Sequence, residues 1–535
     1  MTQAQKHGTI LIRGGVVVDG SGAPPRKMDV AVAGDRIAAV GDLAEWAADT
    51  ILEAAGLVVA PGFIDMHSHS DLALLINGRA ESKIRQGVTT EVIGMCGWSP
   101  APAPEERREE IRKDAGAWGR EVEWTWGSFG EYLEALRRSA TSVNVAPVVG
   151  HGAIRSAVMG EEGRAPTVDE LAAMQREVAR AMEEGAFGIS TGLVYAPGMW
   201  ADTDEVIALA RAMSQADGIY FSHIRSESDK LLEAIEEAVR IGREAGVAVQ
   251  IAHLKAEGTR NWGKTEQALE AIEQARERGV EVSYDCYPYT AWNTGLGQLL
   301  PAWAREGGTE ALLARLTDPE TRATIRGFMT ENAAADPGRW ERRMIASVES
   351  EERRSLQGMT VAQIATEQGR EPEEIVVGLL LAEQGRVSMV GFGMCEEDVR
   401  RVVAHPVGMI GSDAASLAPY GLLGKGHPHP RTYGTFARVL GHYVREEKAL
   451  TLEAAVRKMT SQPAAKLGLE DRGLLAPGLA ADICVFDPNT IADRATYQQP
   501  QRCAEGVKYV IVNGVVEVEG EEHRNRRPGR VLRGR

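Results

Sequence analysis

The chain has 535 residues with a formal net charge of −16, and 44% of its residues are hydrophobic, enough to bury a large core. An acidic surface repels phosphate backbones, and no apolar run approaches the ~18–20 residues that cross a membrane, so we expect neither nucleic acid nor a membrane as partner. Five scattered cysteines without a CxxC pair, and a polar N-terminus at residues 1–7 without a secretory signal, favour the cytoplasm.

The two ends of the chain differ in texture from its middle. Residues 1–60 and 471–525 contain short strand-like runs and tight turns, such as Gly34-Asp35 and Asn513-Gly514. We expect these two segments to form one small β-sandwich domain. The last residues, 526–535, are rich in Arg and Gly and are expected to be a mobile tail.

The middle, residues 61–470, alternates short apolar strands with amphipathic helices such as 168–184 and 231–245. This order predicts an α/β fold, a TIM-type (β/α)₈ barrel. A ninth strand-like run, 386–393, is expected outside the barrel, and residues 290–349 are expected to be an inserted lid subdomain. The eight predicted barrel strands are 58–65, 89–95, 143–149, 187–191, 218–223, 247–253, 280–287 and 407–412.

Side chains that can bind a metal or carry a proton end five of these strands. Each alone is compatible with a buried core residue, because lone Cys and His side chains are often structural. Together they mark one face of the barrel, the face where active sites of this fold are built. His67 and His69 follow the first strand, Cys96 the second, His223 and His253 end the fifth and sixth, and Asp413 follows the eighth.

The types of these residues indicate a hydrolase that depends on bound zinc. Imidazole and thiolate are ligands that zinc prefers, and a site of this kind leaves one position open for water. Zinc lowers the pKa of bound water to roughly 7, which gives a nucleophile at neutral pH. Asp413 beside it is expected to accept the water proton and to deliver it to a leaving nitrogen.

Eight short motifs are spread along the chain: APGFIDMHSH at 60–69, GMCG at 94–97, STGLVY at 190–195, SHIRSE at 222–227, HLK at 253–255, DCYPY at 285–289, HPHPRTYGTF at 427–436 and GLAADICVF at 478–486. They resemble the N-acyl-D-amino-acid deacylase (D-aminoacylase) family of the amidohydrolase superfamily, and the resemblance extends from end to end. Many amidohydrolases bridge two metals with a lysine on strand four, whereas this strand reads GISTG at 188–192. The resemblance implies that Cys96 replaces that bridge.

The resemblance also implies roles for single residues. A tight zinc site is expected at Cys96, His223 and His253, with a weaker second site at His67 and His69, and Asp413 maps to the catalytic aspartate. Four residues are expected around the α-carboxylate of an N-acyl amino acid: Tyr195, Lys255, Tyr287 and Arg431. The plainer alternative makes Lys255 and Arg431 solvated surface charges.

The implied reaction is zinc-dependent hydrolysis of the amide bond of N-acyl-D-amino acids. Two alternatives remain: an amidohydrolase acting on cyclic amides, similar to dihydropyrimidinase, and a non-catalytic scaffold with the same fold. The loop 414–426 is longer than the family pattern and is expected to reshape the side-chain pocket. Preference for D over L substrates follows from the resemblance alone, and the sequence predicts neither the side-chain preference nor the oligomeric state.

Overall fold

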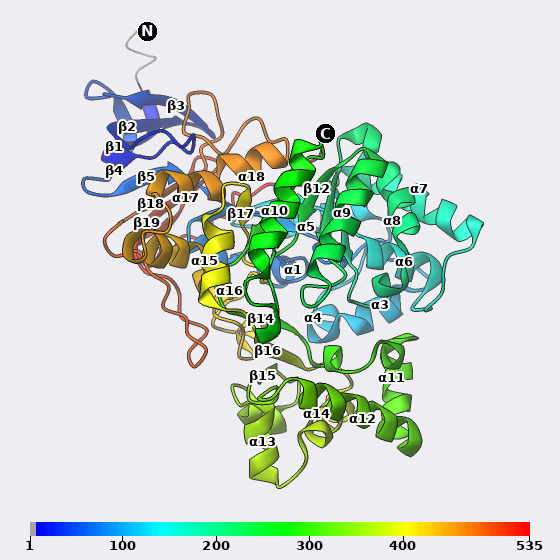
Figure 1. Cartoon of the computed structure of the whole chain (residues 1–535). Helices are drawn as coiled ribbons and strands as arrows, with labels where there is room; N and C mark the ends of the chain where they lie inside the picture. The colour runs from blue at the N-terminus through cyan, green and yellow to red at the C-terminus, as the bar shows by residue number, and fades with distance from the viewer. Residues whose placement is uncertain (1–6, 535) are drawn as a thin grey trace.

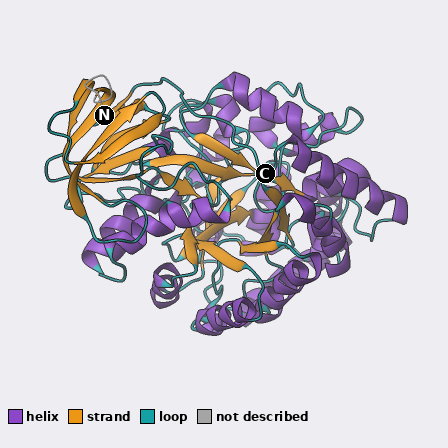
Figure 2. Cartoon of the chain, turned by 90° about the horizontal axis from the view of Figure 1, so that it is seen from above, coloured by secondary structure: helices purple, strands orange, loops and turns teal. Residues whose placement is uncertain are grey.

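The computed structural model describes residues 7–534, and strands lie at its centre with helices around them (Figure 2). Residues 1–6 of the N-terminal stretch considered for a secretory signal, and Arg535 of the tail, lie outside the described residues. No helix in the described part of the chain is both long and apolar enough to cross a membrane. The barrel strands are β6 (Phe63–Asp65), β7 (Val88–Ile93), β8 (Asn144–Pro147) with its continuation β9 (Val149–Gly150), β10 (Gly188–Gly192), β11 (Ile219–His223), β12 (Ala248–Ile251), β13 (Val282–Cys286) and β17 (Gly408–Ile410).

The strands close into a ring. They pair in the orders β6-β7-β8 and β9-β10-β11-β12-β13-β17. Between the two ends, the Met66 N–H donates to the Ile410 carbonyl at 3.2 Å and the Asp413 N–H to the His67 carbonyl at 2.8 Å. These bonds join the first strand to the last, so the strands form the closed (β/α)₈ barrel that the sequence predicts.

The surrounding helices form where the apolar spacing predicts them. Helix α7 (Val168–Glu184) starts with a capping box between Thr167 and Glu170, ends at Gly185 in the left-handed conformation, and buries Met174 and Val178. Helix α9 (Leu231–Ala245) likewise buries one apolar stripe and ends at Gly246. The other outer helices include α5 (Phe129–Ser139), α8 (Thr203–Arg211), α10 (Lys264–Glu277), α15 (Glu396–Ala404) and α17 (Leu452–Met459).

Both ends of the chain build one β domain beside the barrel (Figure 1). Its nine strands are β1 (His7–Val17), β2 (Arg26–Ala33), β3 (Arg36–Gly41), β4 (Ala47–Glu53), β5 (Val58–Pro61), β18 (Ile483–Phe486), β19 (Val507–Val512), β20 (Val515–Glu519) and β21 (Glu522–His523). The two segments meet where β5 pairs with β18. The register of β1 shifts between Ile12 and Gly15, so its first half pairs with β4 and its second half with β5.

One predicted strand is two strands in the structure. The run 58–65 breaks at Gly62 into β5, which belongs to the terminal sheet, and β6, which belongs to the barrel. A Cβ atom on Gly62 would lie only 2.2 Å from the Thr89 hydroxyl, so glycine alone permits this close passage. The sequence run is uniformly apolar because both halves are buried, and apolar pattern therefore could not locate the break.

The lid subdomain is larger than predicted. A separate sheet of β14 (Ala291–Gly295), β16 (Ser388–Phe392) and β15 (Arg343–Ser347) carries α11 (Gly308–Thr317), α12 (Pro319–Ala335), α13 (Val361–Gln368) and α14 (Pro372–Ala382). These elements share their own hydrophobic core and lie together at one end of the molecule (Figure 1). The predicted extra strand is β16, outside the barrel as expected. Because β16 is the central strand of the lid sheet, the subdomain continues past residue 349 to Phe392.

The expectation of a mobile tail is wrong for the described residues up to 534. The Val145 N–H donates to the Arg530 carbonyl at 2.9 Å, and the Leu532 N–H donates to the Val145 carbonyl at 2.8 Å. Strand β10 pairs with β11 on one side and with β9, not β8, on the other, so within residues 7–534 the only barrel strand that pairs with β8 is β7. Buried backbone groups require partners, and the tail supplies them.

Candidate metal centre and active site

The predicted ligands meet at the carboxyl ends of the barrel strands. His67 lies just past β6, Cys96 past β7 and Asp413 past β17, while His223 ends β11 and His253 lies two residues past β12. Cys96, His253 and Asp413 have positive φ angles of 55°, 36° and 50°. Such angles are unfavourable for residues other than glycine and tend to occur at functional sites.

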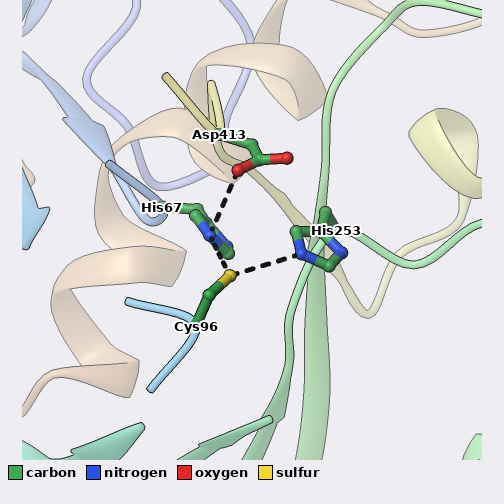
Figure 3. Close-up of side chains that lie close together, drawn as sticks. All are labelled: His67, Cys96, His253 and Asp413. Atoms are coloured by element: carbon green, nitrogen blue, oxygen red, sulfur yellow. Dashed lines mark hydrogen bonds and ion pairs between the residues drawn. The ribbon is translucent and has the colours of Figure 1, made fainter. Parts of the chain in front are cut away.

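Four of these side chains form one compact group (Figure 3). Cys96 Sγ lies 3.3 Å from His67 Nε2 and 3.5 Å from His253 Nε2. His67 Nε2 in turn lies 3.5 Å from Asp413 Oδ1. The donor atoms of His67, Cys96, His253 and Asp413 all lie within 4.8 Å of one another, a spacing that one metal ion can occupy.

His223 and His69 lie at the edges of this group. His223 stacks edge-on against His253, with 4.4 Å between ring centroids, and belongs to a second group with Glu227 and His253. His69 Nε2 lies 3.0 Å from Asp413 Oδ1, and its side chain is 32% exposed to the cavity. The structure therefore brings all five predicted ligands and Asp413 around one point.

The donor set suits zinc. A thiol sulfur with several imidazole nitrogens is the combination that this ion prefers. His223 Nδ1 is buried and makes no hydrogen bond within residues 7–534, although buried polar atoms rarely lack a partner. An ion bound between Cys96, His253 and His223 would satisfy it.

Two carboxylates that sequence reasoning did not select orient the imidazoles. Asp285 Oδ1 lies 3.1 Å from His67 Nδ1, and Glu227 Oε1 lies 2.7 Å from His253 Nδ1. Each carboxylate accepts a hydrogen bond from Nδ1–H, which turns Nε2 of the same ring toward Cys96. Asp285 is the residue before the last of strand β13, and Glu227 follows His223 by four residues. A search for acidic residues at strand ends would have found Asp285.

Charge keeps the central groups ionised. Burial alone would raise the pKa of the Cys96 thiol, but His67 and the hydrogen bond with His253 bring it well below its ordinary value. Burial would also raise the pKa of Asp413, which the neighbouring Arg431 guanidinium and the histidines instead hold well below its usual range. A thiolate ligand and a carboxylate able to accept a proton follow from these shifts.

The residues predicted around the substrate carboxylate surround the same point, and both cations are buried. Arg431 Nη1 lies 2.9 Å from Asp413 Oδ2, and Lys255 Nζ lies 2.9 Å from His253 Nδ1 and 2.5 Å from Glu227 Oε1. Neither is a solvated surface charge, since Arg431 is 3% and Lys255 7% exposed.

The two tyrosines differ in position. The Tyr195 ring packs edge-on against His223 at 5.0 Å, and its hydroxyl contacts Thr294 Oγ1 of the lid at 3.1 Å. Tyr287 lies beneath both cations, with its ring centroid 4.6 Å from the Arg431 guanidinium and 5.6 Å from Lys255 Nζ. Tyr195 lines the main cavity, whereas Tyr287 lines a small void behind it. Tyr287 therefore supports the cations from below.

The site opens into a cavity of about 1200 Å³ between the barrel and the lid. The barrel supplies Cys96, His253, Asp413 and the two cations, and the lid supplies Leu299, Arg343 and Met389. The loop 414–426 packs Leu417 and Leu423 into a small core with Ala73 and also contributes Leu417 to the cavity wall. A cavity of this size accommodates a small-molecule substrate.

A model of the amidohydrolase family matches residues 50–518 of the chain. The chain belongs to this family. Among curated amidohydrolases, it is 40% identical over 529 residues to a D-aminoacylase of Alcaligenes xylosoxydans xylosoxydans, covering 98% of this chain and 97% of that one. It is 38% identical over 528 residues to an N-acyl-D-glutamate deacylase of the same organism, covering 98% and 96%.

Solved structures of amidohydrolases are similar to this chain over nearly its full length. A D-aminoacylase with a binuclear metal centre, described by one-metal activation and second-metal attenuation, superposes with a TM-score of 0.82 at 39% identity, covering 98% of this chain and all of that one. An N-acyl-D-glutamate deacylase of Bordetella bronchiseptica, complexed with zinc and a phosphonate mimic of the tetrahedral intermediate, has a TM-score of 0.81 at 36% identity and the same coverage. A dihydropyrimidinase of Brevibacillus agri shares the fold alone, at 15% identity and a TM-score of 0.56.

Proposed function

We propose that this amidohydrolase hydrolyses the amide bond of N-acyl-D-amino acids, a small-molecule substrate class, and releases a carboxylate and a free D-amino acid. One observation carries the proposal: a zinc-type donor group, an ionised aspartate and two buried cations converge on one cavity. The relatives that match nearly the full length act on N-acyl-D-glutamate or are D-aminoacylases, which supports this substrate class.

Zinc is proposed to bind at Cys96, His223 and His253, with a weaker second position at His67 and His69. The chemistry that bound zinc supplies is that of a Lewis acid, which polarises the substrate carbonyl and makes water acidic near neutral pH. The thiolate and the carboxylate-oriented imidazoles of this chain fit that ion, as does the unsatisfied Nδ1 of His223.

Asp413 is proposed as the group that moves the proton. Its Oδ1 faces His67 and His69, and Arg431 keeps the carboxylate ionised and able to accept a proton from the attacking water. The same oxygen then delivers the proton to the leaving nitrogen, so one residue acts first as base and later as acid.

Arg431, Lys255 and Tyr195 are proposed to bind the α-carboxylate. Buried cations are costly unless anions and acceptors join them; Arg431 pairs with Asp413 and Lys255 with Glu227, but Nε of Arg431 is buried without a hydrogen-bond partner within residues 7–534, and a substrate carboxylate would supply one. The contact between Arg431 and Asp413 adds a consequence that the sequence did not suggest: substrate binding and proton transfer share one guanidinium.

The alternatives have less support. Hydrolysis of cyclic amides commonly uses a lysine bridge on strand four, whereas β10 (Gly188–Gly192) contains none. A non-catalytic scaffold has no use for a complete set of ligands around one point. A cytoplasmic location is part of the proposal and is supported by five cysteines that are all free thiols.

The test is a release assay with paired N-acetyl-D- and N-acetyl-L-amino acids, run beside a zinc determination on the purified protein. We expect about one tightly bound zinc per chain and release of the D-amino acids. Ring opening of hydantoins without release of D-amino acids would contradict the proposal, as would a protein that binds no zinc.

A further inference from the structure

A lysine with no exposed surface lies directly behind Asp413. Lys83, in the short helix α2 (Glu81–Ile84), is 0% exposed. Its Nζ donates to Asp65 Oδ2 at 2.7 Å, to the Ala414 carbonyl at 2.7 Å and to the Ser412 hydroxyl. The ammonium therefore forms hydrogen bonds with the residues on both sides of Asp413, at positions 412 and 414.

Asp65 links these hydrogen bonds to the backbone of His67, just past β6. Its Oδ1 accepts the Ser412 N–H at 2.8 Å and the His67 N–H at 3.2 Å, while its Oδ2 accepts the Ser412 hydroxyl at 2.6 Å. The Asp413 N–H donates to the His67 carbonyl at 2.8 Å. Lys83 and Asp65 thus fix the backbone of Asp413 relative to that of His67.

Glu91 of β7 completes the arrangement from the same side. Its Oε2 accepts the hydroxyls of Ser68 and Ser70, each at 2.5 Å, and its Oε1 accepts the Ser416 hydroxyl at 2.5 Å. Residues 67, 69 and 413 face the metal-binding point, whereas residues 68, 70, 412 and 416 face this buried network. The side chains of both segments therefore divide between these two faces.

Asp413 needs such support because its φ angle is 50°, a conformation that a non-glycine residue keeps only when its surroundings impose it. Three donated contacts from one fixed ammonium, on the two flanking residues and on Asp65, provide that constraint. The carboxylate of Asp413 is then aimed at His67 and His69 instead of relaxing toward Arg431 alone.

We propose that Lys83 is a positioning residue: through Ser412, Ala414 and Asp65 it sets Asp413 at the distance from the metal-binding histidines that proton transfer requires. The inference rests on the proposed function of Asp413 as proton carrier. A displacement of about 1 Å at a reacting group can reduce turnover by ~10²-fold, so a lysine that never touches the substrate can control the rate.

The test compares Lys83→Met with Lys458→Met in the zinc-loaded, full-length protein. Lys458 is a matched control: it is also buried, and its Nζ donates to the carbonyls of His405 and Gly408 at the start of the same strand, β17, far from Asp413. We expect Lys83→Met to lower kcat per bound zinc by ~10²-fold with KM nearly unchanged. Lys458→Met should lower the Tm and leave kcat per bound zinc at the wild-type value.

Lys83→Met leaves two buried carboxylates, Asp65 and Glu91, without their cation, so the variant can fail to fold. The double variant Lys83→Met with Asp65→Asn removes the closer of the two carboxylate charges, while the Asn oxygen can still accept the Ser412 N–H and Glu91 keeps the hydrogen bonds of its three serine hydroxyls. It should fold and show the same loss of kcat per bound zinc. If the folded, zinc-loaded variants lose only thermal stability, as Lys458→Met does, the positioning role is overturned.

A crystal structure of the folded Lys83 variant decides the inference without any substrate. We expect the Asp413 carboxylate to move by about 1 Å from its present 3.5 Å contact with His67 Nε2. An Asp413 that stays in place would overturn the inference. Failure of the wild-type protein to release D-amino acids would instead overturn the proposed function, so the two failures are distinguishable.

Discussion

Cys96 contacts two imidazoles at once, and its thiol is ionised more easily than an ordinary cysteine because of them. Replacing it by alanine removes the only sulfur donor of the group. We expect Cys96→Ala to lose bound zinc and at least ~10²-fold of kcat, more than the 10–100-fold typical of residues behind the ligands. Zinc analysis and turnover are measured on the same preparation. Cys286→Ala, a buried cysteine at the end of β13 outside both metal-binding groups, is the control and should keep both.

Asp413 lies within reach of the metal-binding atoms as well as of the proton path, so its role needs a separate test. Asp413→Asn preserves the shape and one acceptor oxygen but cannot take up a proton. We expect kcat to fall by about 10²–10⁴-fold while zinc stays bound. Kinetics and zinc content again give the answer. Zinc lost in proportion to activity would make Asp413 chiefly a ligand.

Arg431 faces both Asp413 and the cavity, so its substitution is expected to affect substrate binding. Arg431→Lys keeps the charge but loses the fork of two parallel donors that matches a carboxylate. For an N-acetyl-D-amino acid we expect kcat/KM to fall roughly 10- to 150-fold, as for a lost charge-assisted contact of ~1.5–3 kcal/mol. The corresponding amino acid amide lacks the carboxylate and should be a poor substrate of the wild type.

The same pair of substrates separates the two contacts of Arg431. A loss confined to the free acid reports carboxylate binding. An equal loss with acid and amide would mean that Arg431 acts only by holding Asp413, and the substrate-binding assignment would fail.

At the scale of elements, the sequence predicts the parts that depend on local pattern. Helices α7 and α9 end where capping residues and glycines place them, and ligand side chains lie at strand ends because extended segments present alternate residues to one face. The break at Gly62, the extent of the lid and the docked tail were missed. Each depends on contacts between distant segments: Gly62 with Thr89, β16 with β14, and Val145 with Arg530.

The site shows the same division. Residue type and strand position sufficed to select His67, Cys96, His253 and Asp413, since strand ends meet at one rim of a barrel. Asp285 near the end of β13 meets the same criterion and was overlooked, whereas Glu227 and Lys83 could not be selected in this way, because their function depends on which partner they face across the barrel. Tyr287 was assigned to the substrate, but its ring lies under the cations.

The C-terminal tail is expected to stabilise the fold through its hydrogen bonds with the barrel. Ending the chain after Pro528 removes five hydrogen bonds: those of Arg530 and Leu532 with Val145, of the Gly529 N–H with the Thr141 carbonyl, of the Arg530 N–H with Asn144 Oδ1, and of the Gly534 N–H with the Gly185 carbonyl. At about 1 kcal/mol for each bond, we expect a loss of ~4–6 kcal/mol in the free energy of unfolding. Urea denaturation measures it. Arg533→Ala, which keeps the backbone bonds, should be nearly neutral, and an equally small effect of the truncation would mean that the tail only rests on the surface.

At the scale of the whole molecule, one asparagine joins three parts that are distant in sequence. Asn144 of β8 donates from Nδ2 to Asp482 Oδ2 at 3.0 Å, next to strand β18 of the terminal sheet. Its Oδ1 accepts from Asn513 Nδ2 at 2.8 Å, in the β19–β20 turn, and from the Arg530 N–H of the tail at 3.0 Å. Barrel, terminal sheet and tail therefore share a buried polar junction, which explains why a β domain made from both ends of the chain stays fixed to the barrel.

Asn144→Ala is expected to weaken all three attachments together. The substitution leaves the Arg530 N–H without its acceptor and takes one hydrogen bond each from the Asn513 amide and Asp482 Oδ2, which keep their bonds with Pro528 and Arg472. Removing partners of largely buried polar groups costs more than the bonds gain. We expect a loss of about 2–4 kcal/mol in the free energy of unfolding, with kcat unchanged at low temperature because β8 carries none of the ligands. Urea denaturation followed by both far-UV circular dichroism and activity is the measurement, and Asn489→Ala, an exposed position, is the control within ~0.5 kcal/mol. If Asn144→Ala unfolds at the same urea concentration as the wild type, the junction contributes nothing. If instead kcat falls in the folded variant, the start of β8 influences the active site, and the expectation that Asn144 contributes to stability alone would be wrong.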